Sequence, residues 1–250
     1  MAINTVIKRL RKQGSERYGI YFRRLYPPFR VVTVSDAAPA NKKSSFATEG
    51  TSVLIMEDVI SELCTDKDDF VSPELVPYLG GKAHILVGSS QKSKRISHST
   101  SHAETHAAAK IIPVGQIVSL RLGEAIMHCK YNFMLTARLL AEITDTGALP
   151  YPCDHYIDCM DLWELSCGMR GIPQDKSQRL GILSMREERR SERLRRLLHV
   201  RTKWMVCDFL TKREGADSKS LLELLSCGIW SIDSTLRCRE RFGATETLEG

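Results

Sequence analysis

Several features of secreted and membrane proteins are missing from this sequence. No apolar run is long enough to cross a bilayer. The basic N-terminus lacks the long apolar core and the small-residue cleavage site of a secretory signal. The eight cysteines form no C-x-x-C pair, so we interpret them as reduced, mostly buried thiols. We therefore expect an intracellular protein, cytoplasmic or nuclear, that has no membrane partner.

Charge is unevenly distributed along a chain of ordinary globular composition. The 250 residues are 42% hydrophobic and 26% charged, with a net charge of +6. Residues 8–30 are basic, residues 57–74 are acidic, and residues 186–203 carry eight basic side chains against three Glu. Cations that bind phosphates beside carboxylates that bind a metal would suit a nucleic-acid hydrolase. A solvated helix face is the alternative explanation of such charge runs.

Residue patterning predicts an α/β domain over residues 29–213, with insertions at 57–81 and 113–150. A basic N-terminal segment (1–28) precedes it, and a helical tail (214–250) follows it. Strands are expected at about 29–35, 52–56, 83–88, 155–159 and 194–202, and helices at about 3–13, 99–113, 115–144, 160–169, 176–192, 203–212 and 218–227. The first three strands should form a meander that packs on the helix that follows them.

Three aspartates occupy positions at or near the ends of these elements. Asp36 follows the first strand, where it is placed either for a site or simply to begin a turn. Asp158 lies at a strand-to-helix junction, a common place for functional residues, although a helix cap is the alternative. Asp208 falls in the second turn of the helix expected at 203–212.

The stretch from Ser89 to Ala109 supplies a fourth acidic residue. Its basic loop leads through a Ser/Thr-rich turn into an Ala-rich helix that carries Glu104. A carboxylate in this position suggests metal-dependent phosphate chemistry. However, Ser101 followed three residues later by Glu104 also matches a capping box, in which Glu104 would only bind the free N–H groups of the helix.

A zinc deaminase is a further alternative for the same helix. His102-Ala-Glu104 matches one half of the deaminase signature, and Pro152-Cys153 begins the other half. The next cysteine is Cys159, six residues on, whereas the signature needs its second ligand three residues on. The spacing therefore argues against this assignment.

Four segments together resemble the ribonuclease H domain of copia-type retrotransposon polyproteins. In chain order they are VTVSDAAPANKKSS…TEG, SSQKSKRISHSTSHAETHAA, YIDCMDLWEL and CDFLTK, and the resemblance covers about 31–212. Each motif is weak alone, but four in the right order on the expected elements are fairly specific. The resemblance implies a ribonuclease H-like mixed five-stranded sheet, strand order 3-2-1-4-5, with helices on both faces.

The resemblance also implies a metal site and a reaction. Two Mg²⁺ ions, with Mn²⁺ as the alternative, would be held by Asp36, Glu104, Asp158 and Asp208. Asp36 would bridge both ions, Glu104 and Asp158 would bind one, and Asp208 the other. Two such ions clamp the attacking water and the leaving oxygen. The reaction would be hydrolysis of the RNA strand of an RNA–DNA hybrid.

Substrate contacts are expected on both sides of Glu104. Ser99 and Thr100 are candidates for reading the 2′-OH that distinguishes RNA from DNA. The candidates for phosphate contacts are Lys92, Lys94, Arg95 and Lys203. Residues 1–28 would be the tail of a reverse transcriptase, which makes the reverse transcriptase part of the same polyprotein a further partner.

Some positions depart from the family pattern. Cys159 follows the third carboxylate, where a small or amide residue is typical, and Cys207 replaces the usual Ala before Asp208. The loop before the last carboxylate has no histidine, which puts a histidine-assisted product release in doubt. A catalytically inactive, nucleic-acid-binding remnant of such an element is the alternative function, because retrotransposon fragments decay freely and an isolated copy need not be active.

Overall fold

The computed structural model describes residues 20–38, 46–59, 79–97, 99–131, 134, 136–212 and 219–232. The helix expected at 3–13, most of the insertion expected at 57–81 and the end of the C-terminal tail lie outside the described residues. None of the described helices is long and apolar enough to span a bilayer. The proposed domain boundaries stay predictions.

The centre of the fold is one mixed sheet. Its strands are β1 (Phe29–Ala38), β2 (Phe46–Glu57), β3 (Gly81–Ile96), β4 (Cys153–Ile157), β5 (Arg196–His199) and β6 (Ile229–Trp230). Their order is β5-β4-β1-β2-β3-β6. β1, β2 and β3 are antiparallel neighbours, whereas β4 runs parallel to β1 and β5 parallel to β4. The order expected for five strands is thus confirmed, and β6 adds a short sixth strand beside β3.

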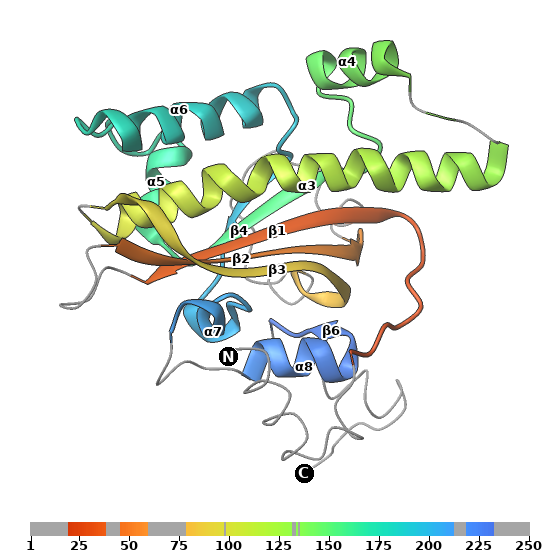
Figure 1. Ribbon diagram of the computed structural model, residues 1–250, viewed down its shortest axis with the longest axis horizontal. Coiled ribbons are helices and arrows are strands. Elements are labelled where there is room, and N and C mark those ends of the chain that lie inside the picture. The colour runs from red at the N-terminus through yellow and green to blue at the C-terminus, as the bar shows by residue number, and fades with distance from the viewer. Residues whose placement is uncertain are drawn as a thin grey trace.

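Helices cover both faces of this sheet (Figure 1). On one side lie α3 (Thr100–Tyr131), α5 (Met160–Ser166) and α6 (Lys176–Arg190), with α4 (Ala137–Thr146) beyond α3. On the other side lie α7 (Asp208–Thr211) and α8 (Lys219–Cys227). Because both faces are covered, β1 is buried along nearly its whole length, which suits its β-branched sequence. The fold is therefore ribonuclease H-like, as expected.

α3 corrects the prediction that a helix ends near Pro113. The helix continues through Pro113, which lies exposed on its outer side, and extends to Tyr131. The opposite side buries Ile111 and Ile112. Gly115 also packs close to the sheet, since an added Cβ would stand 2.3 Å from Thr33 Cγ2. Packing along β1 therefore outweighs the local cost of proline.

The segment after β5 also differs from the prediction of a helix at 203–212. Only a 3-10 turn, η3 (Thr202–Trp204), and the short α7 are helical there. Between them, Met205, Val206 and Cys207 are buried in the core beneath the sheet. Burying three consecutive side chains prevents one continuous amphipathic helix. Asp208 is consequently the first residue of α7 and does not lie in a second turn.

A buried ion network closes the N-terminal ends of the parallel strands. Arg30 of β1 and Asp154 of β4 are both 0% exposed, with Arg30 Nη1 3.4 Å from Asp154 Oδ2. Arg195 donates to Asp154 Oδ2 at 2.5 Å and to Asp58 Oδ2 at 2.8 Å. Burying charge is costly unless it is paired, and here each charge has a partner. The network therefore ties β1, β4 and β5 together at this end.

Candidate metal centre

A carboxylate cluster lies at the opposite, C-terminal ends of β1 and β4. Asp36 is near the end of β1, and Asp158 directly follows β4. Glu104 lies in the second turn of α3, which starts over the same edge of the sheet. Each offers an oxygen atom, and these oxygens all lie within 4.8 Å of one another. Parallel strands bring their carboxyl ends together, which is why residues far apart in sequence meet here.

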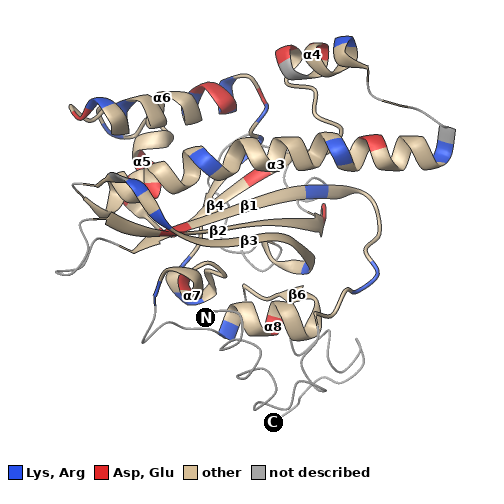
Figure 2. Ribbon diagram, viewed as in Figure 1, with Lys and Arg blue, Asp and Glu red and all other residues tan. Residues whose placement is uncertain are grey.

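Asp208 lies beside this trio and is not part of it. Its Oδ1 accepts a hydrogen bond from Lys212 Nζ, one helical turn further along. Its charge nevertheless contributes to raising the pKa values of Asp36 and Asp158. Figure 2 shows acidic residues near the start of α3, on the adjacent strands and on α7. All four carboxylates expected from the sequence therefore gather at one edge, three of them tightly. Their role as metal ligands stays a prediction.

Glu104 does not cap the helix, so the capping-box alternative is wrong. Its Oε1 accepts from the backbone N–H of Ala37 at 2.7 Å. The hydroxyl oxygen of Ser99 is the one that accepts from a first-turn N–H, that of His102, at 3.1 Å. The helix begins at Thr100, which puts Ser101 inside it. Ser99 therefore does the capping, and Glu104 is left to face the sheet.

The second oxygen of Glu104 indicates that a cation fits here. Oε2 is buried and accepts no hydrogen bond from a described donor. Buried polar atoms without partners are rare in folded proteins. Glu104 and its neighbours Asp36 and Asp158 offer only oxygen ligands, which is the donor set that Mg²⁺ prefers. These three carboxylates therefore suit the Mg²⁺ ions that the sequence motifs imply.

The pKa values of the cluster show the electrostatic cost of bringing these groups together. Burial raises the pKa of Glu104 well above its usual range, and the charges of Asp36 and Asp158 raise it further. Burial also raises the pKa of Asp36, and a hydrogen bond from Thr211 opposes this. Burial raises that of Asp158, against a hydrogen bond from Thr202. Ionised carboxylates this close repel one another unless a cation lies between them.

Sequence reasoning missed the residues that position Asp36. Thr211 Oγ1 donates to Asp36 Oδ2 at 2.5 Å, and both side chains are buried. Gly50 pairs with Asp36 in the sheet, and an added Cβ there would stand 2.7 Å from Thr211 Cγ2. Because Gly50 has no Cβ, α7 can lie directly on β2. Gly50 ends the TEG motif and Thr211 lies in CDFLTK, so the motifs contain these two positioning residues as well as acidic ones.

The expected substrate-binding residues are exposed around this edge. Ser99 and Thr100 lie at the start of α3, and Lys92 and Lys94 near the end of β3. Lys203 is exposed in η3, where its Nζ stands 4.3 Å from the centre of the Trp204 ring. The side chain of Arg95 lies outside the described residues. No contact tests their roles, which stay predictions.

The zinc deaminase alternative finds no support at this centre. Over the described ranges, the trio is the only group of His, Cys, Asp and Glu with ligand atoms close enough to hold a metal. His102 instead faces Asp175, with Nε2 3.5 Å from Oδ1. Burial raises the pKa of Cys153 to about 12, which disfavours the thiolate that zinc needs.

Comparisons with known proteins leave the family open. No protein-family model matches the chain, and no curated protein sequence matches it either. Among solved structures, it is similar to RNase H1 from the halophilic archaeon Halobacterium salinarum NRC-1, with 13% identity, a TM-score of 0.36, and coverage of 69% of this chain and 86% of that one. It is also similar to LC11-RNase H1, isolated from compost by a metagenomic approach, with 12% identity, a TM-score of 0.41, and coverage of 77% and 98%.

Proposed function

We propose that this chain is a Mg²⁺-dependent nuclease that hydrolyses the RNA strand of RNA–DNA hybrids. The observation that carries the proposal is the trio of Asp36, Glu104 and Asp158, whose oxygens lie within 4.8 Å of one another. Glu104 belongs to that trio, and its buried Oε2 accepts no hydrogen bond from a donor outside the trio in the described residues. The order of the four sequence motifs supports the same conclusion independently of the geometry.

The proposed ligands would act together with the groups that fix them. Asp36, Glu104 and Asp158 would hold one divalent ion, and Asp36 and Asp208 a second. Bound ions of this kind activate a water molecule and stabilise the charge that develops on the phosphate. The chain's own contribution is positioning: the N–H of Ala37 holds Glu104, and the hydroxyl of Thr211 holds Asp36. Lys212 holds Asp208 in the same way.

The proposed substrate would lie across the start of α3. Ser99 and Thr100 are exposed within about one turn of Glu104, where they could contact a ribose 2′-OH. Lys92, Lys94, Arg95 and Lys203 would contact phosphates. The origin in a copia-type retrotransposon polyprotein, with its reverse transcriptase as partner, is the part of the proposal that rests on the motifs alone.

Replacing Asp158 by Asn tests the proposal. The purified chain should cleave the RNA of a labelled hybrid in Mg²⁺ or Mn²⁺, and Asp158→Asn should lower the rate by about a hundredfold or more. Replacing a residue that only supports a metal ligand already lowers metal affinity or activity by about 10- to 100-fold. Cleavage is measured by gel analysis of the RNA strand.

Asp161→Asn is the matched control. Asp161 lies three residues further on, in the first turn of α5, and its exposed side chain pairs with Arg170. This variant should cleave at the wild-type rate. Undiminished cleavage by Asp158→Asn would contradict the assigned role. A wild-type chain that binds the hybrid without cleaving it in either ion would indicate the non-catalytic remnant instead.

A further inference from the structure

The turn η3 lies beside the carboxylate cluster, between β5 and α7. Just before it, the N–H of Val200 donates to the carbonyl of Ile157 at 2.8 Å, and His199 Nε2 lies 3.1 Å from the carbonyl oxygen of Asp158. The side chain of Thr202, the first residue of η3, forms a hydrogen bond with the Asp158 side chain. The turn therefore starts next to one of the proposed metal ligands.

The backbone of η3 is fixed from the other side by the C-terminal elements. Ser220 Oγ of α8 donates to the carbonyl of Lys203 at 3.0 Å, and Trp230 Nε1 of β6 donates to the carbonyl of Trp204 at 2.8 Å. Within the turn, the N–H of Trp204 donates to the carbonyl of Arg201 at 2.9 Å. These bonds fix the points from which the side chains of the turn project.

Two cations at this turn lie over one aromatic ring, and we call Arg201 and Lys203 the η3 cation pair. Lys203 Nζ stands 4.3 Å from the centre of the Trp204 ring, and Arg201 Cζ stands 5.9 Å from it. Both cations are exposed, whereas Trp204 is half-buried and packs against the core beneath the sheet. A cation within about 6 Å of an indole is attracted to the ring. Trp204 therefore limits where the two side chains point, although it leaves their charge intact.

No carboxylate neutralises the η3 cation pair within the part of the chain that the structure describes. There, neither side chain forms an ion pair or donates a hydrogen bond to an acidic group, and both are in contact with Trp204. Two positive charges beside the same ring also repel each other, and an anion bound with them would relieve that repulsion. The η3 cation pair is therefore suited to binding an anion.

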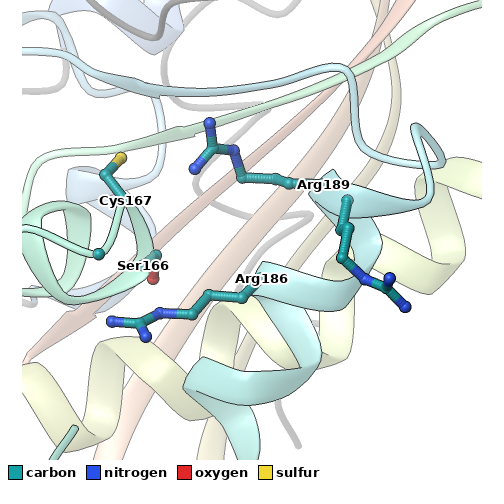
Figure 3. A pocket seen from close by; sticks show the side chains of 6 residues that line it. Ser166, Cys167, Arg186 and Arg189 are labelled. Carbon is teal, nitrogen blue, oxygen red and sulfur yellow. The ribbon is translucent and has the colours of Figure 1, made fainter.

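Arginines of a pocket between α5 and α6 differ in this respect. The pocket, of about 310 Å³, is shown in Figure 3 and is lined by Ser166, Cys167, Gly168, Arg186, Arg189 and Arg190. Arg186 donates to the carbonyl oxygen of Leu165 at 3.0 Å, and Arg190 pairs with Glu187 at 2.9 Å. These two arginines are therefore engaged in stabilising the helices, unlike the η3 cation pair.

We propose that Arg201 and Lys203, oriented by Trp204, together bind a backbone phosphate of the nucleic acid beside the carboxylate cluster. Lys203 already belongs to the proposed substrate contacts. Arg201 is a new ligand of the phosphate, and Trp204 is a positioning residue. A guanidinium offers planar pairs of N–H donors that match phosphate oxygens, and an ammonium adds a compact charge. The inference rests on the proposed function for the identity of the ligand.

Hybrid binding by a charge variant tests this inference. The affinity for a short fluorescent RNA–DNA hybrid is measured by anisotropy at several salt concentrations, in EDTA so that no cleavage occurs. Arg201→Gln should weaken binding by about three- to tenfold and reduce the slope of log K against log salt by about one, which is the effect of losing one phosphate contact. Wild-type affinity and salt slope in this variant would overturn the assignment.

Arg138→Gln is the matched control. Arg138 is exposed on α4, which lies on the opposite side of the sheet from α7 (Figure 1). Its replacement removes the same charge and should change the affinity by less than about twofold. Equal weakening by Arg138→Gln and Arg201→Gln would show a diffuse effect of net charge and overturn the assignment.

A DNA duplex of the same sequence shows which group Arg201 contacts. Phosphates are common to both duplexes, so Arg201→Gln should weaken binding to the hybrid and to the DNA duplex by the same factor. A loss confined to the hybrid would indicate a contact with the ribose 2′-OH and would overturn the phosphate assignment.

Two replacements of Trp204 test its positioning role. Trp204→Leu keeps an apolar side chain against the core but removes the aromatic face, so both cations remain and are no longer oriented. Binding should weaken by about two- to fivefold with an unchanged salt slope, and Trp204→Phe should restore the affinity. Thermal unfolding checks that both variants fold. Equal hybrid affinity of the two variants would overturn the role assigned to the ring.

The outcome is separable from the proposed function. A wild-type chain that does not cleave the hybrid in Mg²⁺ or Mn²⁺ ends the nuclease proposal, yet weaker binding of both duplexes by Arg201→Gln would still support the η3 cation pair. Conversely, normal binding by Arg201→Gln beside normal cleavage by the wild type would end this inference alone.

Discussion

His155 is a buried imidazole held in its neutral form between two hydroxyl groups. The Thr33 hydroxyl lies 2.8 Å from Nδ1 and donates its own proton to the carbonyl of Asp154, so it accepts from Nδ1–H. The Ser35 hydroxyl, 3.2 Å from Nε2, then donates to the ring. Burial lowers the pKa of His155 to about 3. Thus one tautomer is selected by the neighbouring strand.

Acidification should cost stability through His155. The unfolded histidine binds a proton near its ordinary pKa of about 6.5, whereas the folded one does so only near 3. The contribution of neutral His155 to the free energy of unfolding is therefore complete above about pH 6.5. It is lost as pH falls, by up to about 1.4 kcal/mol per pH unit. The raised pKa values of Asp36, Glu104 and Asp158 act in the opposite direction.

His155→Gln isolates this effect, because the carboxylates are common to both proteins. Urea unfolding from about pH 7 to about pH 5 should show the wild type losing stability relative to the variant as pH falls. The amide keeps one donor and one acceptor for Thr33 and Ser35. If the difference in unfolding free energy between the wild type and His155→Gln stays constant across this pH range, the pKa of His155 is not lowered by folding.

Residue identities alone predicted which acids meet but not how each is held. Asp36, Glu104, Asp158 and Asp208 could be selected because each occupies a motif. Ser101 and Glu104 have the spacing of a capping box, but the same spacing also occurs inside a helix. Because α3 begins at Thr100, Ser101 lies inside the helix and does not cap it. Only the fold shows that Glu104 bonds to the N–H of Ala37 and that its second oxygen has no described donor.

Among the secondary-structure elements, α7 depends on Gly50 for its position. An added Cβ at Gly50 would stand 2.7 Å from Thr211 Cγ2 and 2.8 Å from the carbonyl oxygen of Cys207. Gly50→Ala should therefore push α7 away from β2 and lower the free energy of unfolding by about 1–3 kcal/mol. It should also weaken metal binding, because Thr211 would move away from Asp36. Denaturant unfolding and a Mn²⁺ titration measure the two effects.

Gly88→Ala is the control for this change. Gly88 lies on the neighbouring strand β3, where an added Cβ would meet only Ile85 Cδ1, at 3.6 Å. That is ordinary van der Waals contact, so stability should be nearly unchanged. Equal stability of the two variants would show that α7 does not need the close approach.

Elements were predicted well where periodicity was strong, and boundaries failed where tertiary packing decides. The meander and the charged helix α6 follow from their patterns. The continuation of α3 through Pro113 follows from contact with β1, which no local pattern encodes. Likewise, the buried segment 205–207 looks helical in sequence and becomes a core-filling connection.

For the whole molecule, a cation at the cluster should stabilise the folded state. Because the trio assembles only on folding, binding adds RT ln(1 + [L]/Kd), about 2.7 kcal/mol when the free ion is at 100 times its Kd. Mg²⁺ should therefore raise the unfolding temperature of the wild type, and EDTA should reverse the change. Asp36→Asn should lose most of this response, and an equal response in that variant would place the ion elsewhere.

The ion network and the carboxylate cluster occupy opposite ends of the same pair of parallel strands. Val31 of β1 pairs with Cys153 of β4, next to Arg30 and Asp154, and the same register continues toward Asp36 and Asp158. A slip of one residue would turn every side chain of β1 to the other face. It would leave Arg30 in the interior with no countercharge and would send Asp36 away from Glu104. The ion network therefore favours the one alignment of β1 and β4 that also assembles the metal centre. Misaligned chains would be too unstable to accumulate.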